Sequence, residues 1–365
     1  MIRCGIVGLP NVGKSTLFNA LLARAAAEAA NYPFCTIEPN TGRVGVPDER
    51  LDKIALLAKS AQVVPAQIDF VDIAGLVRGA SKGEGLGNQF LANIREVDAI
   101  IQVLRCFEDE NVTHVEGRID PLRDAETVAV EMMLADLESL ERRADSIAKK
   151  AKSGEAEAKA DLRVIEPILR ALRNGSPARS VAVAPDDERR LKMLQLLTAK
   201  PVLYVCNVGE DEAATGNALS ENIAAMAAKE GAGSVVISAK VEAEVAQLED
   251  PIERQEFLES LGLKETGLVR VIRAAYALLG LITFLTAGPK ESRAWTVRRG
   301  AKGPEAAGTI HTDFERGFIC AETIAYDDYV GLGGEQGAKN AGKMRQEGRD
   351  YVVKDGDVML FRFNV

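Results

Sequence analysis

The chain has 365 residues, of which 47% are hydrophobic and 27% are charged, so it can bury the cores of two or three domains. Its formal net charge of −9 argues against indiscriminate binding to nucleic acid, and any RNA contact would need a local basic patch. No apolar run reaches the roughly 18 residues that a membrane span requires, and the first residues predict a strand rather than a signal peptide. We therefore expect a protein that does not associate with a membrane.

The cysteines predict a reducing compartment, the cytoplasm. Their number is odd, and none lies at a CxxC or Cys/His spacing that would suggest a disulfide framework or a zinc site. They are Cys4, Cys35, Cys106, Cys206 and Cys320. Cys4 and Cys206 lie in apolar strands and are expected in the core. Cys35 lies in a loop and is either an oxidant-sensitive thiol or an inert one.

Strands and helices alternate along the first part of the chain. Residues 2–8 predict a buried strand, and a glycine-bearing loop then leads into a helix with apolar residues at Leu17, Leu21 and Leu22. Further strands are predicted at residues 68–72, 99–104, 201–206 and 234–237. Such alternation predicts an α/β fold whose mostly parallel sheet is covered by helices on both faces.

From about residue 125 to residue 200 the pattern changes to two long helices. Leu134, Leu137 and Leu140 share one helical stripe, and a second stripe follows the polar turn at residues 152–155. We predict an antiparallel, coiled-coil-like hairpin inserted between two strands of the sheet. Residues 141–173 carry nine Lys/Arg against six Asp/Glu, which is either an ordinary solvated face or a basic binding surface.

The helix–strand alternation stops after about residue 280. Residues 293–297 and 357–363 resemble short strands, and Gly-rich turns separate such segments. We predict a nucleotide-binding domain over residues 1–280, containing the insertion at 125–200, and a small α+β domain over residues 281–365.

Residues 8–15, Gly-Leu-Pro-Asn-Val-Gly-Lys-Ser, match the phosphate-binding pattern GxxxxGK[ST] between a strand and a helix. Backbone N–H groups of such a loop surround phosphate oxygens, and the helix N-terminus adds a favourable dipole. Lys14 is predicted to reach the β- and γ-phosphates and is therefore a catalytic candidate. The predicted phosphate-binding residues are Asn11, Val12, Gly13, Lys14, Ser15 and Thr16.

Two further segments predict the rest of a GTPase-type phosphate site. Asp72 ends a strand, where its carboxylate would hold the Mg²⁺ shell, and Gly75 would let the backbone approach the γ-phosphate. Thr36, in the loop at residues 31–36, would add a second hydroxyl, so Ser15, Thr36 and Asp72 are the predicted metal ligands. Each motif alone is weak, but their order and spacing after the phosphate loop favour a pair of switch loops.

The base-recognition loop favours ATP. Guanine-specific domains carry Asn-Lys-x-Asp after a hydrophobic strand, whereas this chain has Asn207-Val-Gly-Glu210. The Asp of that motif accepts hydrogen bonds from guanine donors that adenine lacks, and losing such a pair removes much of the discrimination. Asn207 can serve the N6/N7 edge of adenine. The predicted base site consists of Asn207, Val208, Glu210, Ser238 and Ala239, and the alternative is a loop that tolerates both bases.

The residue that usually orients the attacking water is missing. Many related enzymes place Gln after the Asp-x-x-Gly segment, whereas this chain has Leu76, which cannot orient water. Asn11 could help to coordinate a K⁺ ion that stands in for an arginine finger. His114 lies in the polar loop at residues 108–117 and is either a solvated histidine or a catalytic replacement for the glutamine.

These motifs resemble the Obg-like ATPases of the YchF type, a branch of the translation-factor GTPase superfamily. The resemblance is carried by residues 8–15, 31–40, 72–91, 207–210, 294–296, 308–315 and 334–339. It implies a GTPase-like fold that prefers ATP, a helical insertion and a C-terminal TGS domain. It also implies binding to ribosomes or the large ribosomal subunit, a stress-related regulatory role, and participation of His114 in hydrolysis.

Three functions are compatible with the sequence. The first is a slow Mg²⁺-dependent ATPase switch that contacts its partner, ribosome or RNA, through the helical hairpin and the C-terminal domain. The second is a GTP-preferring translation-factor GTPase, and replacing both Glu210→Asp and Val208→Lys tests the base assignment that separates the two. The third is a ribosome- or RNA-binding adaptor whose hydrolysis is incidental.

Overall fold

The computed structural model describes residues 2–29, 40–73, 86–109 and 118–364. Their contacts define two compact units. The first comprises the described residues of Met1–Arg24, Ile37–Gly42 and Asp69–Val271. The second comprises the described residues of Ala25–Thr36, Arg43–Ile68 and Ile272–Val365. None of the helices in these described segments is long and apolar enough to cross a bilayer.

A six-stranded sheet with the order β2-β4-β1-β5-β6-β7 carries the N-terminal half of the fold. Its strands are β1 (Arg3–Val7), β2 (Thr41–Gly45), β4 (Gln67–Asp72), β5 (Ala99–Arg105), β6 (Val202–Asn207) and β7 (Gly233–Ile237). The central pairs β1–β4, β1–β5, β5–β6 and β6–β7 are parallel. Every residue of β5 and β6 is buried, which explains why these strands are nearly continuous apolar runs.

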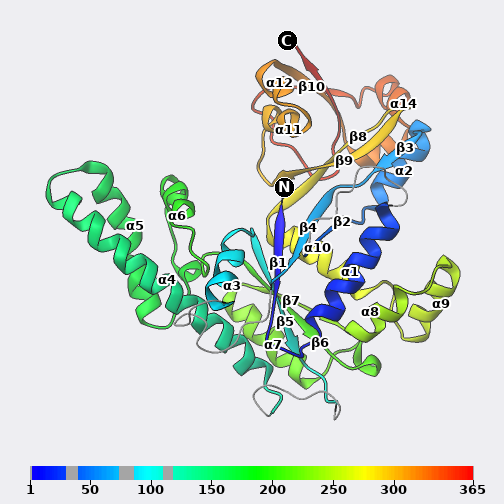
Figure 1. The fold of residues 1–365 in the computed structure, drawn as a ribbon. Coiled ribbons are helices and arrows are strands. Elements are labelled where there is room, and N and C mark those ends of the chain that lie inside the picture. The colour runs from blue at the N-terminus through cyan, green and yellow to red at the C-terminus, as the bar shows by residue number, and fades with distance from the viewer. Residues whose placement is uncertain (1, 30–39, 74–85, 110–117, 365) are drawn as a thin grey trace. The chain divides into compact units, whose positions relative to one another are not determined.

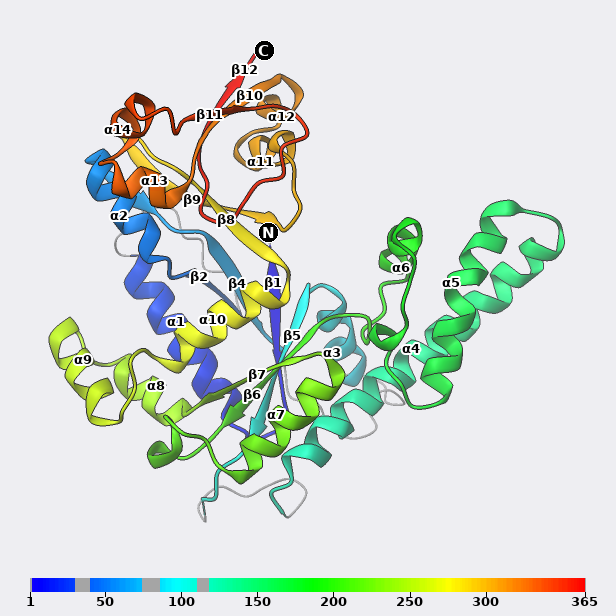
Figure 2. The same cartoon turned by 180° about the vertical axis from the view of Figure 1, so that it is seen from behind.

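Helices cover both faces of this sheet, as predicted. Figures 1 and 2 show α1 on one side of the strands and α3 and α7 on the other. The helices that follow the strands in this part of the chain are α1 (Lys14–Ala29), α3 (Leu86–Arg95), α7 (Ala218–Glu230), α8 (Ala239–Val245), α9 (Pro251–Ser260) and α10 (Gly267–Leu278). The predicted α/β class is therefore confirmed.

The predicted helical hairpin is present between β5 and β6. It consists of α4 (Pro121–Lys152) and α5 (Ala156–Arg173), followed by the short helix α6 (Glu188–Leu194). The carboxylate of Asp120 caps α4, and Gly154 makes the turn with a φ of 95°. The two helices share an apolar core that consists mainly of Leu140, Val164, Ile165, Ile168, Leu169 and Leu172.

A buried carboxylate fixes the return of the chain from the hairpin to β6. Asp136 of α4 accepts hydrogen bonds from the backbone N–H groups of Leu197 and Thr198, at 2.9 and 2.8 Å, and from the Thr198 hydroxyl. Burial raises the pKa of Asp136, although these donors oppose the shift. This residue therefore serves the structure of the insertion and not a solvent-facing site.

The second unit is built on a mixed sheet with the order β11-β10-β12-β8-β9-β3. Its strands are β3 (Gln62–Val64), β8 (Leu281–Thr286), β9 (Glu291–Arg298), β10 (Phe318–Ile324), β11 (Arg345–Glu347) and β12 (Val358–Phe363). Its helices are α2 (Glu49–Ala58), α11 (Gly303–Ile310), α12 (Thr312–Arg316), α13 (Tyr326–Gly331) and α14 (Glu335–Asn340). Phe284, Phe318 and Phe361 pack at its centre.

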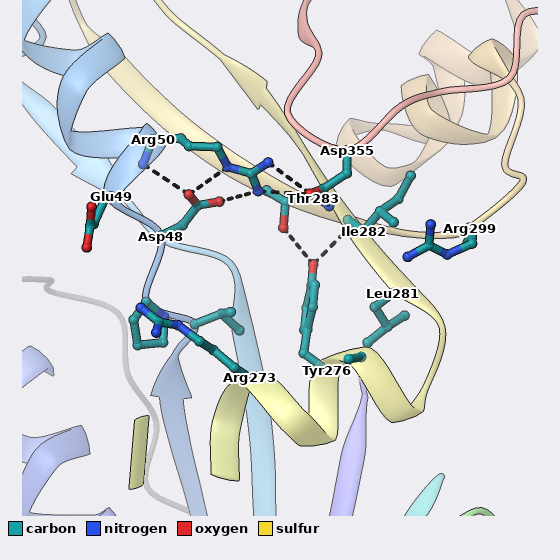
Figure 3. Close-up of a pocket in the computed structure, with 13 residues that line it drawn as sticks. Asp48, Glu49, Arg50, Arg273, Tyr276, Leu281, Ile282, Thr283, Arg299 and Asp355 are labelled. Atoms are coloured by element: carbon teal, nitrogen blue, oxygen red, sulfur yellow. Dashed lines mark hydrogen bonds and ion pairs between the residues drawn. The ribbon is translucent and has the colours of Figure 1, made fainter. Parts of the chain in front are cut away.

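Residues 43–68 belong to this second unit although they lie more than 200 positions before its C-terminal part, which begins at Ile272. Strand β3 pairs in parallel with β9, and the guanidinium of Arg50 bridges Asp48 and Asp355 (Figure 3). By contacts, therefore, the C-terminal unit begins near residue 272 and includes an N-terminal segment. The division of function at residue 280 stays a prediction from sequence.

Candidate nucleotide-binding site

The loop between β1 and α1 passes through two left-handed backbone positions. Asn11 and Gly13 both have positive φ, 62° and 91°. A Cβ atom at Gly13 would lie 2.2 Å from the side-chain amide nitrogen of Asn207, so only glycine fits there. The side chain of Val12, between these two residues, is buried and anchors the loop.

Lys14, the first residue of α1, contacts Asp72, the last residue of β4. Strand β4 runs parallel to β1 in a register that pairs Ile6 with Asp72. The Lys14 ammonium donates to the Asp72 carboxylate at 2.6 Å, and the two side chains are 10% and 23% exposed. A partly buried cation is thus held beside the predicted metal-binding carboxylate, at the mouth of the phosphate loop.

The oxygen donors predicted for a metal fit Mg²⁺ in chemical type. Of the predicted ligands Ser15, Thr36 and Asp72, Ser15 is exposed in the first turn of α1 and Asp72 adds a carboxylate, whereas Thr36 lies outside the described residues. Within residues 2–29, 40–73, 86–109 and 118–364, no cluster of three or more Asp, Glu, His or Cys could hold a cation alone. The set therefore suits Mg²⁺, which takes one or two protein oxygens and completes its shell with phosphate and water.

Several predicted site residues lie outside the described residues. They are Cys35, Thr36, Gly75, Leu76 and His114. The described segments bring Asn11, Val12, Gly13, Lys14, Ser15, Thr16 and Asp72 together at one edge of the sheet, with Asn207 packed against Gly13.

Asn207 ties the base-recognition loop to the phosphate loop. Its side-chain amide donates to the carbonyl of Val12 at 2.9 Å and accepts from the backbone N–H of Ala239 at 2.8 Å. The residue is only 4% exposed. Because an NH₂ group has two donors, this bracing role leaves a second N–H for a base. Sequence analysis assigned Asn207 to base recognition and missed its structural role.

The remaining base-site residues divide into core and surface. Val208 is buried and its backbone N–H bonds the carbonyl of Ile237, so its side chain belongs to the core. The carboxylate of Glu210 accepts from the ammonium of Lys240 at 2.7 Å. The hydroxyl of Ser238 is buried and has no hydrogen-bond partner among the described residues, so it is a polar group available to a neighbour.

A second network fixes the start of the loop that leads to His114. The backbone N–H of Cys106 donates to the carbonyl of Asn207, and the side chain of Asn217 donates to the carbonyl of Cys106 at 2.7 Å. The buried guanidinium of Arg105 donates to the carbonyls of Phe107 and Asp109. Sequence reasoning missed Arg105 and Asn217; the N-cap position of Asn217 before α7 was the one available signal.

Three cysteines lie in the core beside these networks. Cys4, Cys106 and Cys206 are fully buried, and burial raises the pKa of Cys4. A high pKa keeps a thiol protonated and unreactive. This confirms the expected core positions of Cys4 and Cys206.

The family models match both parts of the chain. The model described as "50S ribosome-binding GTPase" matches residues 3–135. The model YchF-GTPase_C, described as "Protein of unknown function (DUF933)", matches residues 281–364.

Curated relatives match over the full length. The chain is 57% identical over 363 residues to the ribosome-binding ATPase YchF of Haemophilus influenzae, covering 100% of this chain and 99% of the relative. It is 54% identical to the protein of the same name from Bacillus subtilis, with 100% of both chains covered. The Obg-like ATPase 1 of Oryza sativa is 44% identical over 100% of this chain and 92% of the relative.

Two solved structures are also similar to this chain. The YchF GTPase of Schizosaccharomyces pombe matches with a TM-score of 0.89 and 36% identity, covering 99% of this chain and 97% of the other. A GTP-binding protein from Pyrococcus horikoshii matches with a TM-score of 0.60 and 19% identity over 100% of both chains, which supports the fold alone. Because matches above 50% identity span the entire chain and both of its parts, this chain belongs to the family of YchF and Obg-like ATPases.

Proposed function

We propose that this chain is a slow, Mg²⁺-dependent ATPase that switches between two states and binds the ribosome or its large subunit. The observation that carries the catalytic half of the proposal is the Lys14–Asp72 pair at 2.6 Å beside the loop of residues 8–15, which matches the phosphate-binding pattern. The family relationship supports the ribosomal half, because the bacterial relatives are named ribosome-binding ATPases.

The Lys14–Asp72 pair suggests what changes when ATP enters. Lys14 would leave Asp72 and bind the β- and γ-phosphate oxygens, where its charge is needed. Asp72 would then turn toward the metal shell together with the hydroxyls of Ser15 and Thr36. When bound, Mg²⁺ neutralises charge that develops on the phosphoryl oxygens. The N–H groups from Asn11 to Thr16 would hold the rest of the triphosphate.

We propose that His114 orients the attacking water, since the side chain of Leu76 has no polar group. The loop that contains His114 leaves β5 at a point held by Arg105 and Asn217, so the base of the loop is fixed. Replacing His114→Ala should lower turnover while ATP affinity stays unchanged. Unchanged turnover would return His114 to the role of a solvated histidine. A K⁺ ion beside Asn11 is a separate proposal, which potassium dependence of turnover would test.

ATP preference follows from the base loop. Guanine needs an acceptor carboxylate, and in this chain the Glu210 carboxylate is paired with Lys240. Adenine needs no such acceptor, and Ser238 and Ala239 with the second N–H of Asn207 complete the proposed base contacts, while Gly75 is proposed to approach the γ-phosphate. A tenfold or larger preference for GTP in equilibrium binding would contradict this assignment and favour the ordinary GTPase.

Ribosome contact is assigned to the helical hairpin and to the C-terminal part of the chain, and any RNA contact to the same two regions. The chain would work in the cytoplasm.

The decisive experiment measures ATP and GTP binding and turnover with and without ribosomes and potassium. Ribosome stimulation of ATP turnover is the expected result. If Lys14→Ala binds ribosomes as tightly as the parent in the presence of either nucleotide, the chain is an adaptor with incidental hydrolysis.

A further inference from the structure

The first residue after β5 is held at both of its backbone groups by residues that follow β6. The backbone N–H of Cys106 donates to the carbonyl of Asn207 at 2.8 Å, and the Cys106 carbonyl accepts from the side-chain amide of Asn217 at 2.7 Å. Strands β5 and β6 are parallel neighbours in a register that pairs Arg105 with Asn207. The path of the chain beyond β5 therefore depends on the residues that follow β6.

A carboxylate connects Asn217 back to the base-recognition loop. Glu212, the last residue of the 3-10 helix Glu210–Glu212, accepts from the side-chain amide of Asn217 at 2.8 Å. It also accepts from the backbone N–H of Gly209 at 3.3 Å, and both bonds end on the same oxygen, Oε2. A displacement of the base loop at Gly209 must therefore break its bond to Glu212 or move Glu212 and Asn217 with it.

Capping of α7 alone does not account for the amide of Asn217. Its Oδ1 accepts from the backbone N–H of Ser220 at 3.0 Å, which caps the helix. An N-cap needs only this oxygen, which Asp or Ser supplies equally well. The NH₂ group has two hydrogens, and they go to the Cys106 carbonyl and to Glu212. The donor half of the side chain thus serves the link between the two loops.

The described residues beyond Cys106 form one short unit with the end of β5. The guanidinium of Arg105, which is 1% exposed, donates to the carbonyls of Phe107 and Asp109 at 3.1 and 3.2 Å. It also lies over the ring of Phe107, 4.7 Å from the centroid. Residues 106–109 are therefore expected to respond together when their connection to Asn217 changes.

We propose that Glu212 and Asn217 are positioning residues that couple base recognition to the start of the loop after β5. A base bound at Asn207 restricts the backbone of Gly209 and, through Glu212 and Asn217, further orders residues 106–109. Turnover then depends on the base beyond its effect on affinity. This dependence of turnover rests on the proposed role of His114, which follows in the same loop, whereas the ordering of residues 106–109 does not.

Hydrogen exchange of the full chain tests the coupling without hydrolysis. The backbone amides of residues 106–109 are followed by mass spectrometry with Mg²⁺ and saturating tripolyphosphate, and again with a saturating non-hydrolysable ATP analogue. Both molecules offer phosphates to the phosphate loop, but only the second has a base. The ATP analogue should slow exchange at least about threefold more than tripolyphosphate does. Equal exchange with the two molecules would overturn the proposal.

Asn217→Asp removes the two donors and keeps the helix cap. The new carboxylate still accepts from the Ser220 N–H, but it places an oxygen against the Cys106 carbonyl and the Glu212 carboxylate. The protection that depends on the base should be lost. Ser220→Ala is the matched control, because it removes the hydroxyl half of the capping box and leaves the link intact. If Asn217→Asp keeps the protection, or if Ser220→Ala loses it equally, the coupling is refuted.

Variants of Glu212 check the other end of the link. Because both bonds end on one oxygen, the carbonyl oxygen of Gln can accept both. Glu212→Gln should therefore keep the protection, whereas Glu212→Ala should lose it as Asn217→Asp does. Equal behaviour of the two Glu212 variants would count against the link.

Turnover measures the consequence for the reaction. Asn217→Asp should lower kcat for ATP about tenfold, because the loop after β5 is misplaced, while ATP affinity stays within about twofold. In a His114→Ala background the same change should cost little more, since both residues act on one step. An additive loss would overturn the route through His114. If His114→Ala alone leaves turnover unchanged, the proposed role of His114 fails, and the exchange result still decides the coupling.

Discussion

The nucleotide site and the second unit each contain a cation paired with carboxylates, and the two cations differ in the number of carboxylates that hold them. Lys14 in the phosphate loop has one carboxylate partner, Asp72, among the residues that the structure describes. Arg50, in the first turn of α2, has two, Asp48 and Asp355, and each of these also accepts a backbone N–H. A cation with one partner can exchange it for a phosphate at modest cost. A cation held by two anchored carboxylates cannot, and it acts as a structural clamp.

The largest effect should come from removing the exchangeable cation. Lys14→Ala should lower ATP turnover by about 100-fold or more, because a charge aimed at the transferred phosphoryl group is lost. The free energy of unfolding without nucleotide should change little, since Asp72 is partly exposed and can be solvated. Single-turnover hydrolysis and urea unfolding measure the two quantities. If Lys14→Ala unfolded easily but hydrolysed ATP normally, the Lys14–Asp72 pair would be a structural pair and not an exchangeable one.

Removing the buried brace should come next. Asn207→Ala leaves the Val12 carbonyl and the Ala239 N–H without their partner, and each such loss costs about 1–3 kcal/mol. We expect ATP affinity to fall at least tenfold and stability to fall with it. Asn222→Ala, on the exposed face of α7, is the matched control. If both variants bind ATP equally, Asn207 does not couple the two loops.

Base preference should shift by a smaller factor. Lys240→Met removes the partner of Glu210 and leaves its carboxylate free to accept from guanine, so GTP affinity relative to ATP should rise about tenfold. This change is better suited than Val208→Lys, because Val208 is buried and a lysine there would be desolvated. Lys229→Met on α7 controls for the loss of surface charge. An unaltered affinity ratio would mean that Glu210 does not face the base.

Local patterns in the sequence led to Lys14 and Asp72, which the structure places in contact at one edge of the sheet. Lys14 and Asp72 each lie in a short motif at the end of an apolar run, and parallel strands bring such ends together. The second unit was harder to predict. Arg50 and Asp355 are 305 positions apart, and neither lies in a motif. Asn207 was assigned from its motif, but its bonds to Val12 and Ala239 depend on how three loops pack, which periodicity does not encode.

Breaking the clamp should affect stability and not hydrolysis. Arg50→Ala leaves Asp48 and Asp355 close together without their shared cation, and hydrogen bonds to charged groups contribute about 1.5–3 kcal/mol. We expect the urea midpoint to fall while the ATP affinity of folded protein stays the same. Lys53→Ala, exposed on the same helix, is the control. A selective loss of ATP affinity would show that the clamp serves the nucleotide site after all.

The smallest effect concerns the pH dependence of the clamp. Pairing with Arg50 lowers the pKa of Asp355 in the folded state below its unfolded value of about 3.9. The folded state therefore binds this proton less readily, so the stabilisation is present above about pH 4 and is lost as pH falls through the lower folded pKa. Because Asp355 is half exposed, we expect its ion pair to contribute under about 1 kcal/mol to the free energy of unfolding.

Asp355→Asn should be less stable than the parent at pH 7, and the difference should shrink between about pH 4 and pH 2. Urea unfolding across this pH range measures the difference in the free energy of unfolding. If that difference between Asp355→Asn and the parent stayed constant, titration of Asp355 would not be the cause of the pH dependence.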